Sequence, residues 1–452
     1  MSNKFQEINR DEKIVIPANM AGWLDKGSLS RFIVTIVDEL DTSVMENAYK
    51  GGGSAPYPPK MMLSLLFYSY ARGTFSSRKI EESTYELIPV IYITGGLHPD
   101  HDSINNFRKR FFPEIKELFK DILEFAYEME IFKLANISID GTKIKANASK
   151  HKAMSYEYAC KLEKQLTEEV DKLFDMAAES KVENPEIIKE LQFREEKLKK
   201  LKGIKKKIEV RAESRYAEEY SEYELKMSER QMKEEKTGKK IVGPRPNPPE
   251  PNPQPNEQIN FTDEESRIMP VSGGGFEQCY NAQVMVDMDS MLIVGNYVSQ
   301  KSNDKQEIEP CLNELDELPE SIGKVAKGTA DNGYFSEANV NKLSLKGIEP
   351  YISLGRQSHN QSLEEYFQKT PPAPENPTIL ESMKHRLKTE EGKKFYAKRK
   401  STVEPVFGII KEVIGFRRFM LRGLEKVTGE WNIVCIAFNL KRLCVLKKSV
   451  KG

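Results

Sequence analysis

The sequence predicts an α/β (α+β) chain in which a mixed sheet with flanking helices is joined to an all-helical N-terminal domain and a long helical-hairpin insertion. Apolar residues recur at helical spacing through the first 125 residues, and a Lys/Glu-rich stretch with periodic leucines fills residues 150–235. β-branched runs alternate with helix-like runs after residue 260. A length of 452 residues exceeds one ordinary core and predicts two or three domains.

The predicted N-terminal helical domain covers residues 1–125. One helix is expected after a proline pair and before a glycine, in "PPKMMLSLLFYSYARG", and another after a serine N-cap in "SSRKIEESTYEL". A long helix is expected over residues 102–129, with Asp102 as its cap and Ile104, Phe107 and Phe111 on one face. The glycines of residues 51–54 predict a flexible turn, because no Gly-Lys-Ser/Thr follows them as in a phosphate loop.

A helical hairpin is predicted over residues 150–240. Leu162, Leu166, Val170 and Leu173 are spaced by four, four and three, and a second periodic run follows the break at residues 184–185. Its dense charge is typical of a solvated face, with a nucleic-acid or partner surface as the alternative. Residues 241–261 are predicted to be a stiff proline-rich linker, because they contain "PRPNPPEPNPQP".

The sheet is predicted to form from residues 126–149 and 262–452. A strand in "NISID" ends on Asp140, and two β-rich runs joined by a turn at residues 287–290 follow the linker. A helix then leads to a short strand ending on Asp331. Another helix, with Ser336 as cap and Gly347 as stop, precedes the strand "IEPYISL", and the C-terminal part is helical again.

Asp140 and Asp331 are the first candidate site residues, because side chains at adjacent strand ends project into one crevice. Glu404, from the C-terminal helical region, could supply a third carboxylate. Clustered carboxylates repel one another unless a cation is present, and hard Mg²⁺ or Mn²⁺ ions suit all-oxygen sites. Two such ions can promote phosphodiester cleavage, so this set on a ribonuclease-H-like sheet predicts phosphoryl transfer on nucleic acid.

The surroundings of Glu404 predict a polyanionic partner. From residue 384 onward the chain carries 18 Lys and Arg against six Asp and Glu, although the whole chain is neutral. Lys411 lies seven residues after Glu404, two helical turns on, and Pro405 predicts a helix start or kink at Glu404. The candidate DNA-binding residues are Tyr396, Arg399, Lys400, Lys411, Arg417, Arg418 and Lys143.

Several other protein classes are disfavoured by the sequence. The five cysteines are odd in number and show no zinc spacing, which predicts reduced thiols rather than a disulfide framework. No stretch approaches 18 consecutive apolar residues, and the first residues have no apolar signal core, so neither a membrane span nor export is expected. A cytoplasmic protein is the resulting expectation.

The motifs together resemble the DDE-type transposases of bacterial insertion sequences, in the branch with an N-terminal helical domain and a ribonuclease-H-like core. The resemblance covers nearly the whole chain. Its blocks stand in family order: "PPKMMLSLLFYSYARGTFSSRKIE" with "GGLHPDHDSINNFRKRF", "ISIDGTKIKANAS", "YNAQVMVD" with "LIVGNYVSQKSNDKQEIEP", "ADNGYFS" and "STVEPVFGIIK".

The resemblance implies that Asp140, Asp331 and Glu404 hold two Mg²⁺ ions, with Mn²⁺ as a substitute, and catalyse DNA cleavage and strand transfer. In the family signature a tyrosine, a basic residue, the glutamate and a lysine follow one another along one helix, and the basic pair contacts phosphates. Glu404 and Lys411 keep the family interval, Lys400 stands at the basic position next to Arg399, and Tyr396 lies one residue further away.

The partners implied are double-stranded DNA at terminal inverted repeats and at the target, and a second copy of the chain in a synaptic dimer, nucleoid-associated when bound. The segment "DSINNFRKRF" is a candidate DNA-reading helix, with core packing through Ile104 and Phe107 as the alternative. Three other functions remain open: a ribonuclease-H-like nuclease without strand transfer, a domesticated transposase-derived DNA-binding protein, and a coiled-coil scaffold based on residues 150–235.

Overall fold

The computed structural model describes residues 19–50, 55–179, 185–238, 240, 243–271, 273–355, 372 and 375–450. The glycine-rich turn predicted at residues 51–54 lies outside them. The chain divides into two compact units. The first unit comprises Met1–Ala146 and Tyr280–Gly452, and the second comprises Asn147–Cys279.

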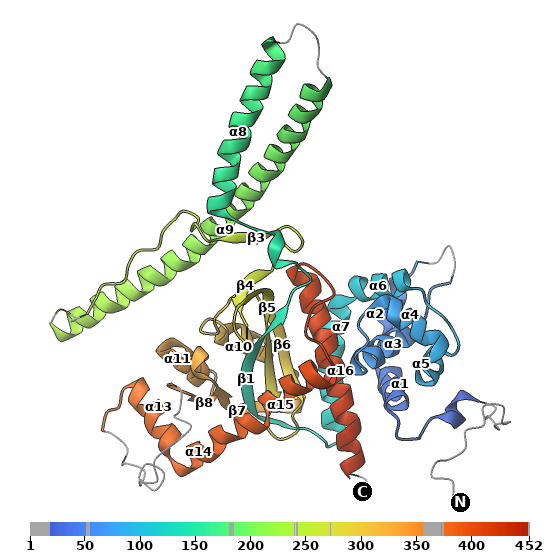
Figure 1. The fold of residues 1–452 in the computed structure, drawn as a ribbon. Helices are drawn as coiled ribbons and strands as arrows, with labels where there is room; N and C mark the ends of the chain where they lie inside the picture. Colours follow the sequence, from blue (N-terminus) through green and yellow to red (C-terminus); the bar gives the residue numbers. More distant parts are fainter. Residues whose placement is uncertain are drawn as a thin grey trace, which may run out of the picture. The chain divides into compact units, whose positions relative to one another are not determined.

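A six-stranded mixed sheet forms the centre of the fold (Figure 1). Its order is β4-β5-β1-β7-β8, with β6 paired to β5. The pairs β1–β7 and β7–β8 are parallel, whereas β4–β5 and β5–β6 are antiparallel. This confirms the predicted ribonuclease-H-like mixed sheet. The strands are β1 (Leu134–Lys145), β4 (Arg267–Pro270), β5 (Phe276–Asp287), β6 (Ile293–Ser299), β7 (Gly323–Ala330) and β8 (Glu349–Ile352).

Helices connect and cover these strands. α10 (Ile308–Asp316) and α11 (Glu337–Leu345) follow β6 and β7, and Ser336 caps α11 as predicted by accepting from the Asn339 amide. The last helix, α16 (Leu424–Val450), packs against β6, α3 and α7. Its Trp431 indole N–H donates to the Gln283 carbonyl at 3.2 Å, and the Asn439 side chain bonds both backbone groups of Ile293. These bonds satisfy polar groups that would otherwise be buried without partners.

The N-terminal helices pack around α3, whose residues from Met62 to Ala71 are all buried. Burial on every side explains why α3 carries apolar residues all round rather than on one stripe. α3 contacts α1, α5 and α16, so these helices share a core with the C-terminal helix. The helices are α1 (Leu29–Glu39), α2 (Ser43–Asn47), α3 (Pro59–Ala71), α4 (Ser77–Glu86), α5 (Ile88–Thr94), α6 (His101–Arg110) and α7 (Phe112–Glu128).

The single helix predicted over residues 102–129 is wrong, because the chain breaks at Phe111 into α6 and α7. Pro113 cannot continue a helix from the preceding turn, but it fits the first turn of a new one. The predicted cap was also wrong: Asp100, not Asp102, accepts the Ser103 amide at 2.8 Å. The apolar face was correct, since Ile104 and Phe107 are buried.

A buried polar cluster connects α6 to α16. The Arg108 guanidinium donates to the Tyr70 hydroxyl at 2.6 Å and lies 4.0 Å from the Glu430 carboxylate. Glu430 also accepts the backbone amides of Met420 and Leu421 at 2.9 and 3.0 Å. The cluster therefore fixes the loop before α16, and it accounts for the burial of Arg108 on a helix that was a candidate for reading DNA.

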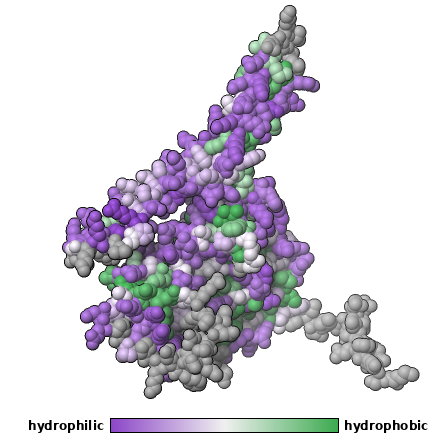
Figure 2. Space-filling view, turned by 60° about the vertical axis from the view of Figure 1, so that its left-hand side comes forward, coloured by the Kyte–Doolittle hydropathy of each residue, from purple (hydrophilic) through white to green (hydrophobic). Residues whose placement is uncertain are grey.

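The second unit is built on the predicted helical hairpin. α8 (Tyr156–Glu179) and α9 (Pro185–Thr237) pack through Ala159, Leu166 and Leu201. The short strands β2 (Ala153–Ser155) and β3 (Gln258–Asn260) pair at its base. Hydrophilic side chains dominate its surface in Figure 2, as expected for solvated helices.

The proline-rich segment contacts α9 along its length. Arg230 donates to the carbonyls of Gly243 and Pro244 at 3.1 and 3.0 Å, and Arg215 donates to the Asn252 carbonyl at 3.0 Å. The carbonyls of this extended segment accept from these arginine side chains, which have several N–H donors each. No helix in the described part of the chain has the length and apolar character to cross a membrane.

Candidate active site

Asp140 lies within β1 rather than at its end, because the strand continues to Lys145. This corrects the prediction that the strand stops there. Ser138 of β1 is the register partner of Thr329 of β7 in a parallel pair. Two residues further on, the same register places Asp140 beside Asp331, which follows the last residue of β7. Side chains two apart on a strand share a face, so the sheet places these two aspartates next to each other.

Gly141 allows β1 to continue past Asp140. A Cβ at this position would collide with the Gln283 amide and lie 2.9 Å from Asn281 Oδ1. Both amides belong to β5 and are fully buried. The glycine after the aspartate is therefore required by the close approach of β5 side chains to the β1 backbone.

Asp331 caps the short 3₁₀ turn η4 (Asn332–Tyr334) and accepts the Gly333 amide at 2.7 Å. Gly333 also marks how close a further carboxylate lies. A Cβ on Gly333 would be 2.9 Å from Asp331 Oδ1 and 3.5 Å from Asp304 Oδ2. Asp304 and Asp331 thus border the same small space.

Glu404 reaches the site through a break in the C-terminal helical region. α14 (Glu390–Ala397) passes into the 3₁₀ turn η5 (Lys398–Ser401), and α15 (Val403–Gly408) starts after Thr402, whose φ and ψ are −116° and −81°. The helix start predicted from Pro405 is confirmed. The break lets Arg399 and Glu404, five residues apart, face the same point.

Arg399 joins two of the predicted carboxylates. Its Nη2 lies 2.7 Å from Asp140 Oδ2, and its Nη1 lies 3.6 Å from Glu404 Oε1. Arg399 and Asp140 are 12 % and 17 % exposed, whereas Glu404 is 52 % exposed. Asp140 is therefore held in a buried ion pair, while Glu404 has the freedom of a surface side chain.

The electrostatics of Asp140 follow from this crowding. Burial raises the pKa of Asp140 to about 7; the Arg399 guanidinium opposes the shift, and the Asp331 and Asp304 carboxylates add to it. Burial alone would lower the pKa of Arg399, but the neighbouring carboxylates, Asp140 first among them, raise it overall. Because burial and the neighbouring carboxylates disfavour the ionised form of Asp140, that form needs a positive charge beside it.

Asp304 is a site residue that the sequence reasoning missed. Its Oδ1 accepts from Asn281 Nδ2 at 2.7 Å and from Gln283 Nε2 at 2.9 Å, and it lies 3.5 Å from the Lys143 ammonium. Two signals could have found it: an acid just after a β-rich run, and two amides in the otherwise apolar run "YNAQVMVD". Buried amides on a strand need polar partners, and a nearby acid is the simplest one.

The other predicted residues fall into two groups. Lys143, Lys411 and Tyr396 lie at the site: Lys411 Nζ donates to Thr142 Oγ1, and burial raises the pKa of Tyr396, which adjoins Arg399. Lys411 sits in the π-helical turn η6 (Ile409–Val413), so it is not on a regular continuation of the Glu404 face.

Lys400, Arg417 and Arg418 form the second group, and all three are exposed. Arg417 is paired with Glu412, and its Nε donates to the Lys411 carbonyl at 3.2 Å. Arg418 forms a backbone bridge with Lys145 at the end of β1. Arg417 and Arg418 are thus linked to Lys411 and to the end of β1.

The donor chemistry of this site fits a hard divalent ion. Asp140, Asp331, Glu404 and Asp304 offer only oxygen ligands, and the Arg399 guanidinium shows that positive charge is accommodated between them. In the described residues, however, no three acidic, histidine or cysteine side chains are gathered as a ready ligand set.

Comparison with known proteins gave two family matches. Residues 371–444 match a model described as Transposase DDE domain, and residues 19–110 match one described as Transposase domain (DUF772). The first match contains Arg399, Glu404 and Lys411, and the second covers α1 to α6. No curated protein and no solved structure matched the chain. The family matches confirm the resemblance drawn from the sequence motifs.

Proposed function

We propose that the chain is a DDE-type transposase, which cuts DNA at the inverted repeats of its own mobile element and joins the freed ends to target DNA. The observation that carries this proposal is the grouping of Asp140, Asp331 and Glu404 around the Arg399 guanidinium. Three carboxylates from separate parts of the chain have no evident structural need to share one buried cation, whereas phosphoryl transfer by bound divalent ions does require them.

We assign metal binding to Asp140 and Asp331, which the β1–β7 register fixes side by side, and to Glu404, which completes the set. The family generally uses divalent metals. Two bound Mg²⁺ ions would supply Lewis acidity at the scissile phosphate and charge for the leaving oxygen. Asp304 orients the site from the side of β5, because its carboxylate is already committed to Asn281 and Gln283.

We assign phosphate contacts to the cations around the carboxylates. Arg399 and Lys411 lie at the site itself, and Lys143 flanks it beside Asp304. Lys400, Arg417 and Arg418 are exposed and can extend the contact along the backbone of a bound duplex. Between the two neighbouring basic residues, Arg399 is the better candidate for the cleavage site, since Lys400 points to solvent.

The proposal includes recognition of element ends by the N-terminal helices and synapsis by two copies of the chain. In this proposal residues 1–125 bind the element ends, and residues 126–149 together with 262–452 form the catalytic domain. The hairpin at residues 150–240 and the linker at residues 241–261 form an insertion. Within α6, Ile104, Phe107 and Arg108 are buried, so any reading of DNA falls to exposed side chains such as Asn106, Lys109 and Arg110.

A cleavage assay on duplex DNA that carries the element ends tests the proposal. We expect strand cleavage with Mg²⁺ and none with EDTA, and joined products when target DNA is added. Asp140→Asn, Asp331→Asn and Glu404→Gln should each abolish cleavage while duplex binding survives. Asp316→Asn is the matched control, since Asp316 is an exposed aspartate of α10 that is paired with Lys346.

Cleavage by Asp140→Asn at the wild-type rate in Mg²⁺ would overturn the metal assignment. Cleavage without joined products would instead identify a nuclease that lacks strand transfer. Both outcomes can be read from one gel, because joined products migrate more slowly than the uncut substrate.

A further inference from the structure

A basic cavity lies between the start of α1 and the end of α16. Its volume is about 500 Å³, and both helices belong to the first unit. The lining residues are Lys26, Gly27, Arg31, Phe32, Thr35, Cys444, Lys447 and Lys448. Four of the eight are cations and none is acidic. Sequence positions more than 400 residues apart are thus brought together around one opening.

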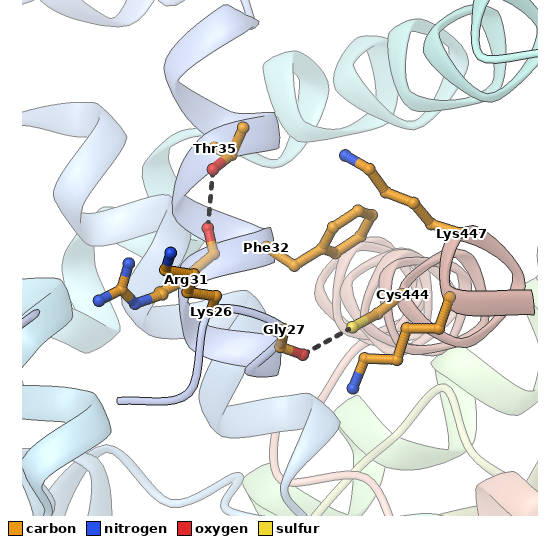
Figure 3. Close-up of a pocket in the computed structure, with 8 residues that line it drawn as sticks. Lys26, Gly27, Arg31, Phe32, Thr35, Cys444 and Lys447 are labelled. Carbon is orange, nitrogen blue, oxygen red and sulfur yellow. Dashed lines mark hydrogen bonds between the residues drawn. The ribbon is translucent and has the colours of Figure 1, made fainter. Parts of the chain in front are cut away.

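The cations are spread around the cavity rather than aimed at one point. In Figure 3, Lys26 and Arg31 lie on the α1 side of Phe32 and Lys447 on the other side. The Lys447 ammonium is 5.4 Å from the Phe32 ring centroid, a cation–π distance. Lys448 lies beside Gly27, where a Cβ would be 3.5 Å from its Nζ. Such a spread suits several negative charges in a row better than a single small anion.

The surroundings leave most of this charge uncompensated. Among the described residues, Lys26, Lys447 and Lys448 have no carboxylate within ion-pair distance. One acid lies beside this group: the Asp25 carboxylate accepts the Gly27 amide at 2.6 Å, and a Cβ on Gly27 would be 3.2 Å from Asp25 Oδ1. Arg31 Nη2 donates to the Ala21 carbonyl, and within the described part of the chain Arg31 Nε is buried without a hydrogen-bond partner. The first turn of α1 contains no acid, and its Ser28 N-cap makes no capping bond, so the α1 dipole adds positive potential, whereas the last turn of α16, which carries Lys447 and Lys448, contributes the opposite sign.

We propose that this cavity is a second DNA-contact site, which binds the phosphodiester backbone of a duplex away from the carboxylates. The apolar floor, formed by Phe32 and Cys444, limits hydration of the lysine stems, and the ammonium groups at the rim are left to meet phosphates. The inference rests on the proposed function, since it names a further surface for the same DNA. It requires no sequence recognition, because the lining offers charge and not base-reading amides or carboxylates.

The test is the salt dependence of binding to a random-sequence 30-base-pair duplex. In the variant Lys26→Gln/Lys447→Gln/Lys448→Gln, the slope of log K against log salt should become shallower by about two to three, at roughly 0.9 per lost phosphate contact. Binding at moderate salt should weaken at least about tenfold. The control is Lys324→Gln/Lys342→Gln/Lys346→Gln, which removes the same charge from lysines paired with Glu320, Glu309 and Asp316.

Protection of lysines from acetylation, read by mass spectrometry of the wild-type chain, gives an independent measurement. Duplex DNA should protect Lys26, Lys447 and Lys448 and leave Lys342 and Lys346 reactive. An unchanged salt slope in the cavity variant, or protection by inorganic phosphate or an acidic peptide but not by DNA, would overturn the inference. The difference between the wild type and the cavity variant on random duplex reports on the cavity, whereas cleavage of element ends reports on the proposed function, so either can fail without the other.

Discussion

Arg399 Nη2 lies 2.7 Å from Asp140 Oδ2, so an arginine that the sequence offered as a DNA contact is the buried partner of a proposed metal ligand. Replacing it by glutamine leaves Asp140 without its cation. Breaking one side of a buried pair typically costs about 3–5 kcal/mol. We therefore expect Arg399→Gln to lower the melting temperature in EDTA, and Mg²⁺ to stabilise this variant more than the wild type. The measurement is thermal unfolding with and without Mg²⁺.

Arg399→Lys is the matched control for that experiment. It keeps the charge but not the planar fork, so it should retain much of the stability in EDTA while losing cleavage activity. An EDTA melting temperature for Arg399→Gln equal to that of the wild type would show that Asp140 does not depend on this partner.

The raised pKa of Asp140 predicts a pH dependence of stability in the absence of metal. Its folded-state pKa of about 7 lies above the ordinary aspartate value of 3.8, so the unfolded chain loses the proton first as pH rises. The unfolding free energy should therefore fall by a few kcal/mol between about pH 4 and pH 7. Asp140→Asn should lack this component. The measurement is denaturant unfolding in EDTA at several pH values. If the unfolding free energies of the wild type and of Asp140→Asn change with pH in the same way, the raised pKa of Asp140 is contradicted.

Gly141→Ala tests the close approach of β1 and β5. The added methyl group would press on the Gln283 and Asn281 amides, and overpacking of this kind costs about 1–3 kcal/mol. We expect lower stability and reduced cleavage, because the same amides hold Asp304. Gly203→Ala in α9 is the control: a Cβ there meets nothing within 4 Å, so it should stabilise by about 0.5–1 kcal/mol. Denaturant unfolding measures whether each substitution lowers or raises the free energy of unfolding.

Asp304→Asn tests the residue that sequence reasoning missed. The change replaces an acceptor of two buried amides and removes the charge facing Lys143. Partners that orient metal ligands typically contribute 10–100-fold to affinity or activity, so we expect a loss of about that size in single-turnover cleavage. Duplex binding should stay near the wild-type value. Full activity in Asp304→Asn would make this carboxylate a structural group only.

Arg108→Met and Lys109→Met separate the two interpretations of α6. Arg108 is buried against Tyr70 and Glu430, so its loss should destabilise the chain by about 3–5 kcal/mol. Lys109 is exposed on the same helix, and Lys109→Met should leave stability unchanged while weakening DNA binding if α6 contacts DNA. Melting temperatures and duplex titrations of both variants provide the comparison.

Local sequence signals predicted most of the fold. Prolines, glycines and caps marked helices such as α3 and α11, and β-branched runs marked β5 to β8. The sequence could not show that β1 continues past Asp140, because only the tertiary approach of Gln283 explains why a glycine permits it there. Pro113 could have indicated the helix break at Phe111, but the regular spacing of apolar residues across it favoured one continuous helix.

The sequence indicated the carboxylates of the candidate site but not the side chains that contact them. Asp140, Asp331 and Glu404 were assigned from strand ends, from chain order and from a family resemblance. That Arg399 rather than Lys400 faces them depends on the 3₁₀ turn and the Thr402 backbone, which no sequence period indicates. Asp304 was overlooked because its partners are amides on a strand that is otherwise apolar.

The Arg399 Nη2 group is paired with Asp140 and the Nη1 group faces Glu404, so both terminal amino groups already have acidic neighbours. While Arg399 serves as the counter-charge of the metal-free protein, it is withheld from the substrate, and ions that took over this neutralisation would set it free. Metal binding and DNA binding at the cleavage site would then increase each other's affinity to the same extent. A low Mg²⁺ concentration would therefore lower the affinity for DNA at this site as well as slow the reaction.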